Sequence, residues 1–593
     1  MTVPEKLSAL RTLMGERKIT AYIIPSDDFH GSEYVGDFFK ARAYMSGFTG
    51  SAGTLVVLPE SAHLWTDGRY FLQAALQLEG SGIELMKIGE PGVPSVNDFL
   101  ADRLEENSKI GFDGRVISAA FADGLKASLQ KKHIAFSAGE DLVDTVWAER
   151  PAISAEKAWA LRDEYAGSRK EKIEKVRESM EKNDCALLLA AAPEQIAWLL
   201  GLRGNDVECT PVFLSYMLIS REKALLFANE SIFDDAIKAS LAADGVELLP
   251  YSSVYGVLQK ECAGKTVWAD AARTNFSLMS CMESAERIEK KASPIELMKA
   301  VKSPAEQEGM KKAHILDGAA VTTFIYWLKT HVGKEKITEL SASEKLLEFR
   351  KEQEGFVERS FETIMGYGAH GAIIHYAPTP ETDCELQPRG LCLVDSGGQY
   401  AFGTTDITRT VVVGELTDEE RRIFTLVLKG HLRLGNARFK YGCGGGAVDH
   451  LAREPLWEKA LDYNHGTGHG VGFVLSVHEG PQRIHWNGPA KDVPFEPGMI
   501  TSNEPGFYVE GKFGVRHENL VLCVEKEKSE YGRFLGFENL TMVPFDVDGL
   551  DLSLLDGEEK RLLNDYHRTV REAISPYLDA EEKAWLESVT AEI

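Results

Sequence analysis

Apolar positions in the N-terminal half of the chain follow one order twice. Residues 6–24 carry Leu7 and Leu10 at helical spacing and lead into the apolar run 21–25. Residues 173–191 repeat this layout with their own apolar helix face and the run 186–190. Each copy continues with a helix-like stretch that ends at an apolar–glycine step, followed by two further strand-like runs. Helices that alternate with strands in this way predict two α/β domains built from a duplicated unit, residues 1–150 and 151–297.

A third unit begins with a clear helix start. Ser303 can cap the helix, Pro304 suits its first position, and Glu306 completes a capping box. After about residue 360 the chain becomes rich in glycine, with strand-like runs and turns, and the last forty-odd residues return to charged amphipathic helix. We therefore predict an α+β domain over residues 298–593 with a helical tail. Trp585 in that tail would pack on this domain or on a second subunit.

Size and charge narrow the class of protein. A chain of 593 residues fits three domains of ordinary size. The formal charge of −25 argues against nucleic acid or an anionic membrane as the main partner, because phosphate binding needs clustered Lys and Arg. No segment has the apolar length of a signal peptide or a membrane span. The eight cysteines form no Cys-x-x-Cys pair, and Cys392 and Cys523 lie in apolar runs, as expected of buried thiols. We expect a soluble cytoplasmic protein without a nucleic-acid or membrane partner.

Ionisable residues concentrate in the third unit, where nine of the fifteen histidines lie between residues 370 and 517. Asp395 directly follows an apolar strand-like run, and Asp406 directly precedes a β-branched one. The link between them is rich in turn formers, so a hairpin would bring both carboxylates to one face of a sheet. Aspartate is disfavoured inside strands unless something binds it. Either aspartate taken alone could equally cap a turn.

A second cluster is the segment His465-Gly-Thr-Gly-His469-Gly-Val-Gly, and His478 lies nine residues after His469. Glycines keep side chains away and allow the backbone to approach a ligand or ion closely. A single histidine here could be a hydrogen-bonded core residue. Two histidines among so many glycines favour a functional site.

Two further carboxylates, Glu504 and Glu518, lie beside apolar β segments that resemble a second hairpin. Together with Asp395, Asp406 and His469 they form a set in which four of five groups are anionic. Buried together, these groups would repel one another by several kcal/mol without counterions. Oxygen ligands with one imidazole suit Mn²⁺, Co²⁺ or Zn²⁺ rather than an iron–sulfur or thiolate site. Four carboxylates neutralise two divalent ions, which predicts a dinuclear hydrolase.

The same residues carry a resemblance to a known family. Their contexts are Val-Asp-Ser-Gly, Thr-Thr-Asp-Ile-Thr-Arg-Thr, His-Gly-Thr-Gly-His-Gly, Asn-Glu-Pro-Gly and Arg-His-Glu-Asn. This order is similar to that of the pita-bread metallopeptidases of family M24, which include methionine aminopeptidase, prolidase and aminopeptidase P. The motifs at 46–53, 65–71, 372–378 and 477–481 resemble those of the three-domain cytosolic Xaa-Pro aminopeptidases. The resemblance implies two creatinase-type α/β domains followed by a pseudo-twofold pita-bread α+β domain.

The resemblance also implies roles for the ligands. Asp395 and Asp406 would bind one metal ion. Asp406, His469 and Glu504 would bind the other, with Glu518 bridging the two ions alongside Asp406. Manganese is the metal that the resemblance suggests, with zinc or cobalt as alternatives. Glu504 would also act catalytically, as the group that passes a proton to the departing proline nitrogen.

Four other residues match substrate-site positions of the family. His375 and His478 would hold the scissile carbonyl and stabilise the oxyanion, and they count as catalytic residues together with Glu504. Arg69 would contact the substrate from the N-terminal domain, and His465 also lies at an active-site position. His517 stands where relatives often carry an aliphatic residue, which leaves its effect on the neighbouring ligands open.

The implied activity is removal of the first residue from peptides that carry proline at the second position, by a homodimeric enzyme. The first alternative is a prolidase, which cleaves only Xaa-Pro dipeptides. Methionine aminopeptidases lack two large N-terminal domains. A non-catalytic peptide- or histone-binding pita-bread module is a remote alternative, because such relatives lose metal ligands that are all present here.

Overall fold

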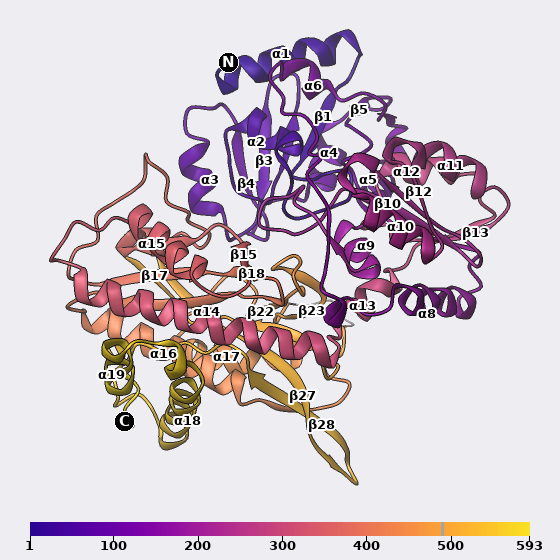
Figure 1. Ribbon diagram of the computed structural model, residues 1–593. Coiled ribbons are helices and arrows are strands. Elements are labelled where there is room, and N and C mark those ends of the chain that lie inside the picture. Colours follow the sequence, from indigo (N-terminus) through magenta and orange to yellow (C-terminus); the bar gives the residue numbers. More distant parts are fainter. Residues whose placement is uncertain (488–491) are drawn as a thin grey trace. The chain divides into compact units, whose positions relative to one another are not determined.

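The duplicated pattern of the N-terminal half forms two six-stranded sheets with the same topology (Figure 1). The computed structural model describes residues 1–487 and 492–593 and divides into two units, Met1–Glu296 and Leu297–Ile593. The first sheet has the order β4-β3-β2-β1-β5-β6 and the second β12-β11-β10-β8-β13-β14. Corresponding neighbours also agree in direction: two antiparallel pairs lie at the centre of each sheet and three parallel pairs flank them. The predicted duplication is confirmed.

The strands of these sheets are short, and those inside each sheet are largely buried whereas the edge strands β4, β6, β12 and β14 are partly exposed. The first sheet contains β1 (Ala21–Pro25), β2 (Thr54–Val57), β3 (Ala62–Thr66), β4 (Glu84–Lys87), β5 (Lys109–Gly111) and β6 (Ala135–Ser137). The second contains β8 (Leu187–Ala190), β10 (Ser215–Ser220), β11 (Ala224–Ala228), β12 (Val246–Pro250), β13 (Thr266–Ala269) and β14 (Arg287–Glu289). A small separate pair is formed by β7 (Trp159–Ala160) and β9 (Leu202–Arg203).

Helices connect these strands, as the apolar spacing predicts. The two equivalent leading helices are α1 (Val3–Glu16) and α8 (Arg169–Lys182), which bury the spaced apolar residues noted above. The others are α2 (Ala41–Ser46), α3 (Phe71–Gln77), α4 (Val96–Arg103), α5 (Ala119–Leu129), α6 (Leu142–Val146), α7 (Asp163–Ala166), α9 (Pro193–Leu200), α10 (Asp235–Ala243), α11 (Val254–Glu261) and α12 (Phe276–Cys281). Both halves of this unit are therefore α/β domains.

The second unit begins within α13 (Pro294–Ala300) and continues with two longer helices, α14 (Pro304–His331) and α15 (Glu339–Lys351). The predicted capping box is present: the Glu306 N–H donates to Ser303 Oγ at 3.2 Å, and the Ser303 N–H donates to the Glu306 carboxylate at 2.8 Å. Apolar residues of both helices pack with residues of β16, β17 and β20 in one buried cluster. Among the residues that the structure describes, no helix combines the length and the apolar character needed to cross a bilayer.

In the part of this unit that the structure describes, the strands form four sheets, one of them with six strands. Their strands are β15 (Phe356–Arg359), β16 (Ile364–Tyr367), β17 (Leu391–Ser396), β18 (Gly398–Tyr400), β19 (Gly403–Thr404), β20 (Ile407–Val412), β21 (Arg438–Lys440), β22 (Gly468–Gly470), β23 (Glu479–Ile484), β24 (Ile500–Asn503), β25 (Gly506–Val509), β26 (Phe513–Arg516), β27 (Asn519–Ser529) and β28 (Gly532–Asn539). The sheet orders are β16-β17-β20, β21-β28-β27-β24-β22-β23, β15-β18-β19 and β25-β26. The predicted α+β class is confirmed.

The remaining helices are α16 (Asp418–Gly435), α17 (Asp449–Trp457), α18 (Gly557–Ile574) and α19 (Ala580–Val589). The last two form the predicted helical tail. The Trp585 ring lies 5.7 Å from the Tyr326 ring, measured between centroids, so this side chain packs on α14 of its own domain. The first of the two placements that the sequence allows, packing on its own domain, is therefore present.

Candidate metal centre

Each predicted carboxylate pair lies where two antiparallel strands meet. β17 pairs with β20, with Asp395 opposite Thr408, and Asp406 directly precedes β20. The segment between Asp395 and Asp406 is not a simple turn, because it contains β18 and β19, which pair with β15 in a separate sheet. β24 pairs with β27, and Glu504 and Glu518 directly adjoin that strand pair. The strand pairing expected from the sequence is therefore present on both sides of the centre.

The two strand pairs are joined to each other at the carboxylates. The Glu518 N–H donates to the Thr408 carbonyl at 3.1 Å, and the Thr408 hydroxyl donates to Glu518 Oε2 at 2.7 Å. The Ser502 hydroxyl donates to Glu504 Oε1 at 3.1 Å. Neither hydroxyl was singled out from the sequence. Each orients one carboxylate, as groups around metal ligands commonly do.

His469 projects from β22 toward these carboxylates. Its Nε2 lies 3.4 Å from Asp406 Oδ2 and 3.4 Å from Glu504 Oε1. Single ligand atoms of Asp406, His469 and Glu518 all lie within 4.8 Å of one another. His469 Nδ1 lies 2.9 Å from the Gly470 carbonyl, which fixes a proton on that nitrogen. The Nε2 lone pair of the neutral ring is then directed at the carboxylates, the orientation that a metal-binding imidazole needs.

The glycines around His469 serve the strand packing. A Cβ at Gly468 would lie 2.0 Å from the Ser502 carbonyl oxygen, and one at Gly470 would lie 2.3 Å from that of Glu479. Both distances are far below van der Waals contact. At these two positions the expectation that glycine admits a ligand is wrong, because the space is filled by the backbone of β24 and β23.

The electrostatics of the cluster call for cations. Burial raises the pKa of Asp395 to about 6, with Asp406 adding to the effect and Arg516 opposing it. Burial and the neighbouring carboxylates raise the pKa of Glu518 well above its usual range, and burial also raises that of Glu504. Burial opposes protonation of His469, but hydrogen bonding to Asp406 and the nearby negative charges raise its pKa to about 9. Each of these shifts favours a proton on the group concerned, as expected of clustered carboxylates that lack a cation.

Arg516 also contributes to this centre, although the local sequence pattern assigns it no role. Its guanidinium is 2% exposed and donates to Asp395 Oδ2 at 2.5 Å. The other oxygen, Asp395 Oδ1, is buried and has no hydrogen-bond partner among the described residues. A buried carboxylate oxygen without a hydrogen-bond partner, on a group whose pKa is raised by the nearby Asp406 and Glu504, fits divalent cations. The signal was the position of Arg516 on a buried strand two residues before Glu518.

The predicted substrate-site histidines lie around these ligands. The His478 ring is 4.3 Å from the His469 ring between centroids. His375 follows Ile374, whose carbonyl accepts a hydrogen bond from Arg516 at 3.3 Å. His465 Nε2 lies 2.8 Å from the Tyr508 hydroxyl, which accepts from Arg516 at 2.7 Å. A hydrogen-bonded chain therefore runs from His465 through Tyr508 and Arg516 to Asp395.

His517 packs among apolar side chains of the second unit, and Arg69 belongs to the first unit. The His517 ring is fully buried and packs edge-on against Phe424, with centroids 4.4 Å apart. Burial lowers its pKa well below the usual range, so the neutral ring acts as an apolar side chain. In the first unit, the Nε of Arg69 donates a hydrogen bond to Asp67 Oδ1 at 2.9 Å, and its Nη1 donates one to Glu33 Oε1 at 3.2 Å. Its role toward a substrate stays a prediction.

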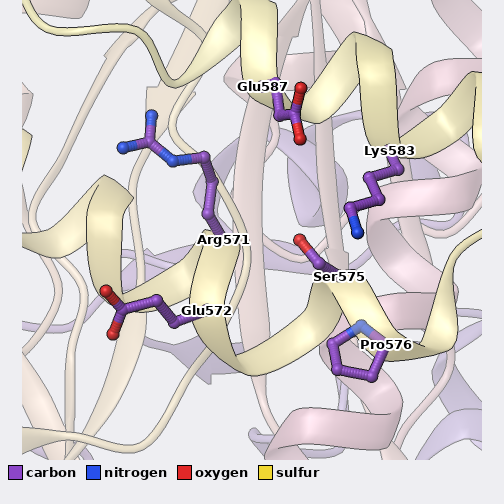
Figure 2. Close-up of a pocket in the computed structure, with 6 residues that line it drawn as sticks. All are labelled: Arg571, Glu572, Ser575, Pro576, Lys583 and Glu587. Atoms are coloured by element: carbon purple, nitrogen blue, oxygen red, sulfur yellow. The ribbon is translucent and has the colours of Figure 1, made fainter.

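A hollow of about 490 Å³ lies elsewhere in the second unit, at the ends of α18 and α19 (Figure 2). It is lined by Arg571, Glu572, Ser575, Pro576, Lys583 and Glu587. None of the predicted site residues lines it, and its open, charged rim is typical of a junction between two surface helices.

Four family models match the chain in sequence. Residues 6–146 and 149–306 each match a Creatinase/Prolidase N-terminal domain. Residues 308–525 match metallopeptidase family M24, and residues 533–593 match the C-terminal region of that peptidase family. The two creatinase-type domains and the metallopeptidase domain of the predicted fold class are confirmed.

Curated relatives and a solved structure agree with these matches. The chain is 40% identical to Xaa-Pro aminopeptidase 1 of Dictyostelium discoideum, over 98% of this chain and 94% of the relative. It is also 40% identical to Aminopeptidase P2 of Arabidopsis thaliana, over 99% and 88% of the two chains. The crystal structure of X-prolyl aminopeptidase from Caenorhabditis elegans, described as a cytosolic enzyme with a di-nuclear active site, superposes with a TM-score of 0.95 at 33% identity, over the whole of both chains.

Proposed function

The chain belongs to the Xaa-Pro aminopeptidases of metallopeptidase family M24, and from this premise we propose which residues perform the reaction. The enzyme releases the first residue of a peptide whose second residue is proline. Five side chains hold two divalent metal ions: Asp395, Asp406, His469, Glu504 and Glu518. The observation that carries this assignment is His469 Nε2, which lies 3.4 Å from carboxylate oxygens of both Asp406 and Glu504 with its other nitrogen already bound.

The ions are most simply Mn²⁺, because the ligand set is mostly carboxylate oxygen with a single imidazole. When bound, such ions polarise the scissile carbonyl and lower the pKa of water toward neutrality. Asp395 and Asp406 would hold one ion, and Asp406, His469 and Glu504 would hold the other. Glu518 would be shared by both ions, as Asp406 would.

The remaining steps belong to the protein. Glu504 takes up a proton from the attacking water and delivers it to the departing proline nitrogen. His478 and His375 donate hydrogen bonds to the scissile carbonyl oxygen as negative charge develops there. The leaving imide nitrogen carries no N–H, so recognition cannot depend on that donor, as it does in ordinary aminopeptidases. His465 and Arg69 contact the substrate.

Hydrolysis of an Arg-Pro-Pro-type peptide, measured before and after chelation, tests the proposal. We expect activity to disappear on chelation and to return with Mn²⁺ more fully than with Zn²⁺. Glu504→Gln should remove nearly all turnover in a protein with an unchanged circular dichroism spectrum. Near-normal turnover of that variant would refute the role of Glu504. Rapid cleavage of Xaa-Pro dipeptides alone would favour a prolidase.

We also propose the division into domains 1–150, 151–297 and 298–593, a cytoplasmic location and a homodimer. The division is supported by the two repeated sheets, which end at Ser137 and Glu289. The cytosolic description of the Caenorhabditis elegans enzyme supports the location. Sedimentation at micromolar concentration tests the dimer. Arg69→Gln should raise the KM for tripeptides with little change in kcat, and an unchanged KM would remove Arg69 from the substrate site.

A further inference from the structure

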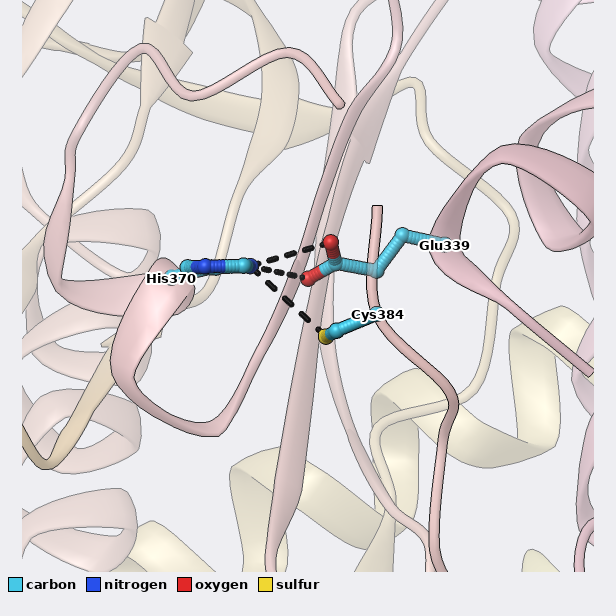
Figure 3. Close-up of side chains that lie close together, drawn as sticks. All are labelled: Glu339, His370 and Cys384. Atoms are coloured by element: carbon cyan, nitrogen blue, oxygen red, sulfur yellow. Dashed lines mark hydrogen bonds and ion pairs between the residues drawn. The ribbon is translucent and has the colours of Figure 1, made fainter. Parts of the chain in front are cut away.

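A second group of side chains that could hold a metal ion lies in the same domain and shares no residue with the five ligands described above. It consists of Glu339 at the start of α15, His370 in the short helical turn Gly368–Ala372, and Cys384 in the long connection between β16 and β17. One ligand atom from each residue lies within 4.8 Å of the others. Figure 3 shows the imidazole edge of His370 directed at the Glu339 carboxylate and the Cys384 sulfur.

The distances converge on a single ring nitrogen. His370 Nδ1 lies 2.9 and 3.0 Å from the two oxygens of Glu339 and 3.7 Å from Cys384 Sγ. In a nucleophilic triad, the thiol and the carboxylate would use opposite nitrogens of the ring. Here both use Nδ1, so the arrangement does not fit a relay. Three donors that face one point fit a chelate.

We propose that Glu339, His370 and Cys384 bind a third metal ion, Zn²⁺, in addition to the ions of the catalytic centre. Thiolate, imidazole and carboxylate are the ligands that zinc combines, whereas manganese prefers oxygen. Tetrahedral zinc with ordinary bond lengths would separate sulfur from nitrogen by about 3.6 Å and nitrogen from oxygen by about 3.3 Å. The separations of His370 Nδ1 from the Glu339 oxygens and from Cys384 Sγ therefore differ from these values by only a few tenths of an ångström. Water completes the fourth position.

The backbone holds these ligands in place before any ion binds. The Glu339 N–H donates to the Cys384 carbonyl at 3.0 Å, which sets these two residues side by side. Glu339 is fully buried, and its oxygens accept from the Tyr376 hydroxyl at 2.8 Å and the Tyr367 N–H at 2.8 Å. A carboxylate has about four acceptor positions, so these two bonds orient the group and leave its face toward His370 available.

The charges also match. Burial, reinforced by Glu339, raises the pKa of Cys384 to about 12, so the thiol keeps its proton when no cation is present. A divalent ion displaces that proton and binds the thiolate. One carboxylate, one thiolate and one neutral imidazole then balance one Zn²⁺ completely.

The ion would stiffen a segment that matters for the proposed function. His370 and Cys384 lie on either side of His375, which follows His370 by five positions. When the ion joins His370 and Cys384 to Glu339, both ends of the segment 370–384 are fixed to the start of α15. Zinc therefore holds the backbone that presents His375. This consequence rests on the proposed function, whereas zinc binding itself does not.

Cobalt absorption tests the site directly, because the catalytic centre contains no sulfur ligand. The metal-free full-length chain is titrated with Co²⁺, and the thiolate-to-cobalt charge-transfer band is recorded in the near ultraviolet. We expect the band in the wild type and in Asp406→Asn, which damages only the catalytic centre. We expect no band in Cys384→Ser. The matched control Cys443→Ser, which changes another partly buried thiol, should keep it.

Zinc affinity provides a second measurement. Tyr376→Phe removes the hydroxyl that orients Glu339 and should weaken zinc binding at this site by about 10–100-fold. Tyr367→Phe is the control, because the Tyr367 hydroxyl bonds to the Arg389 carbonyl and only its backbone N–H reaches Glu339. The proposal is overturned if the wild type shows no cobalt–thiolate band, if the band survives Cys384→Ser, or if metal analysis of the zinc-saturated wild type and Cys384→Ser gives equal contents.

Discussion

A buried triad of charges behind the metal centre gives the sharpest prediction about stability. Glu479, the first residue of β23, lies between Lys299 and Lys302, and all three side chains are at most 3% exposed. Lys302 Nζ donates to Glu479 Oε1 at 2.7 Å, and Lys299 Nζ pairs with the other oxygen. Glu479 pairs with Gly470 across β22 and β23, so the triad supports the strand that carries His469.

Replacing Glu479 with glutamine removes the one negative charge of this triad and keeps the shape of the side chain. At 2.7 Å and an effective dielectric constant of 20, the Lys302 pair alone is worth about 6 kcal/mol. Relaxation of the protein and penetration of water reduce this Coulomb energy, and breaking a buried ion pair typically costs about 3–5 kcal/mol of stability. We expect a loss of that size in the free energy of unfolding at pH 7.

The loss should shrink as the pH rises. A stranded lysine can release its proton in the folded state, at a cost of about 4.6 kcal/mol at pH 7 but only about 1.9 kcal/mol at pH 9. Burial already lowers the pKa of Lys302, and Glu479 opposes this effect. Without Glu479 the folded state loses protons that the unfolded state retains, so stability rises with pH in this window. The difference between variant and wild type should fall by about 2–3 kcal/mol between pH 7 and pH 9.

Hydrogen exchange of amides in β23 and β24, measured against urea at both pH values, reports on this region alone. Glu538→Gln is the matched control, because its pair with Lys526 is exposed and 3.9 Å long, and it should cost under about 1 kcal/mol. Replacing Lys299, Lys302 and Glu479 together by methionine should restore most of the loss, since no unpaired charge remains. A cost below about 1 kcal/mol for Glu479→Gln, or a cost unchanged at pH 9, would refute the reasoning.

Three further predictions concern the same domain. Burial lowers the pKa of His567 to about 3, so between pH 6.5 and that value only the unfolded state takes up the proton, and stability falls as the pH falls. His567→Gln removes this effect. In urea titrations, the loss of stability between pH 7 and pH 5 should therefore be smaller by about 2 kcal/mol in the variant. Gly468→Ala forces a methyl group against a carbonyl of β24 and should cost at least about 1–3 kcal/mol in the same assay, whereas Gly557→Ala, with open space around it, should cost nothing. Arg516→Met leaves the buried Asp395 without its ion-pair partner and should destabilise the metal-free protein by about 3–5 kcal/mol. Added Mn²⁺ should reduce this difference between variant and wild type. An equal difference with and without metal would contradict the role of Arg516 as counter-charge.

Local rules explain the parts of the fold that the sequence predicts. The capping box at Ser303, the repeated helix–strand order and the strands beside Asp395 and Glu518 all depend on residues close in sequence. Period and turn chemistry are visible in such segments. Residue identity also singled out Asp406, His469 and Glu518, which lie together in the structure, because carboxylates beside apolar strands are costly without a partner.

Pairings across long sequence distances could not be predicted. Glu479 lies 177 positions from Lys302, and Arg516 lies 121 positions from Asp395. Nothing in the local pattern around these residues indicates which charge each of them meets. The role of Gly468 was misassigned for the same reason, since only the fold shows that a neighbouring strand occupies the space beside it.

Net charge predicts that the two proposed metal sites differ in what they can do. The catalytic cluster has four carboxylates, and Arg516 offsets one of them, so three negative charges remain around a neutral His469. One divalent ion would leave a buried negative charge, whereas two leave a single positive charge. Excess positive charge suits a site that must stabilise the developing charge on a carbonyl oxygen. The site formed by Glu339, His370 and Cys384 is neutral with one zinc ion and so offers no such attraction, which suits an ion that holds the chain rather than one that reacts.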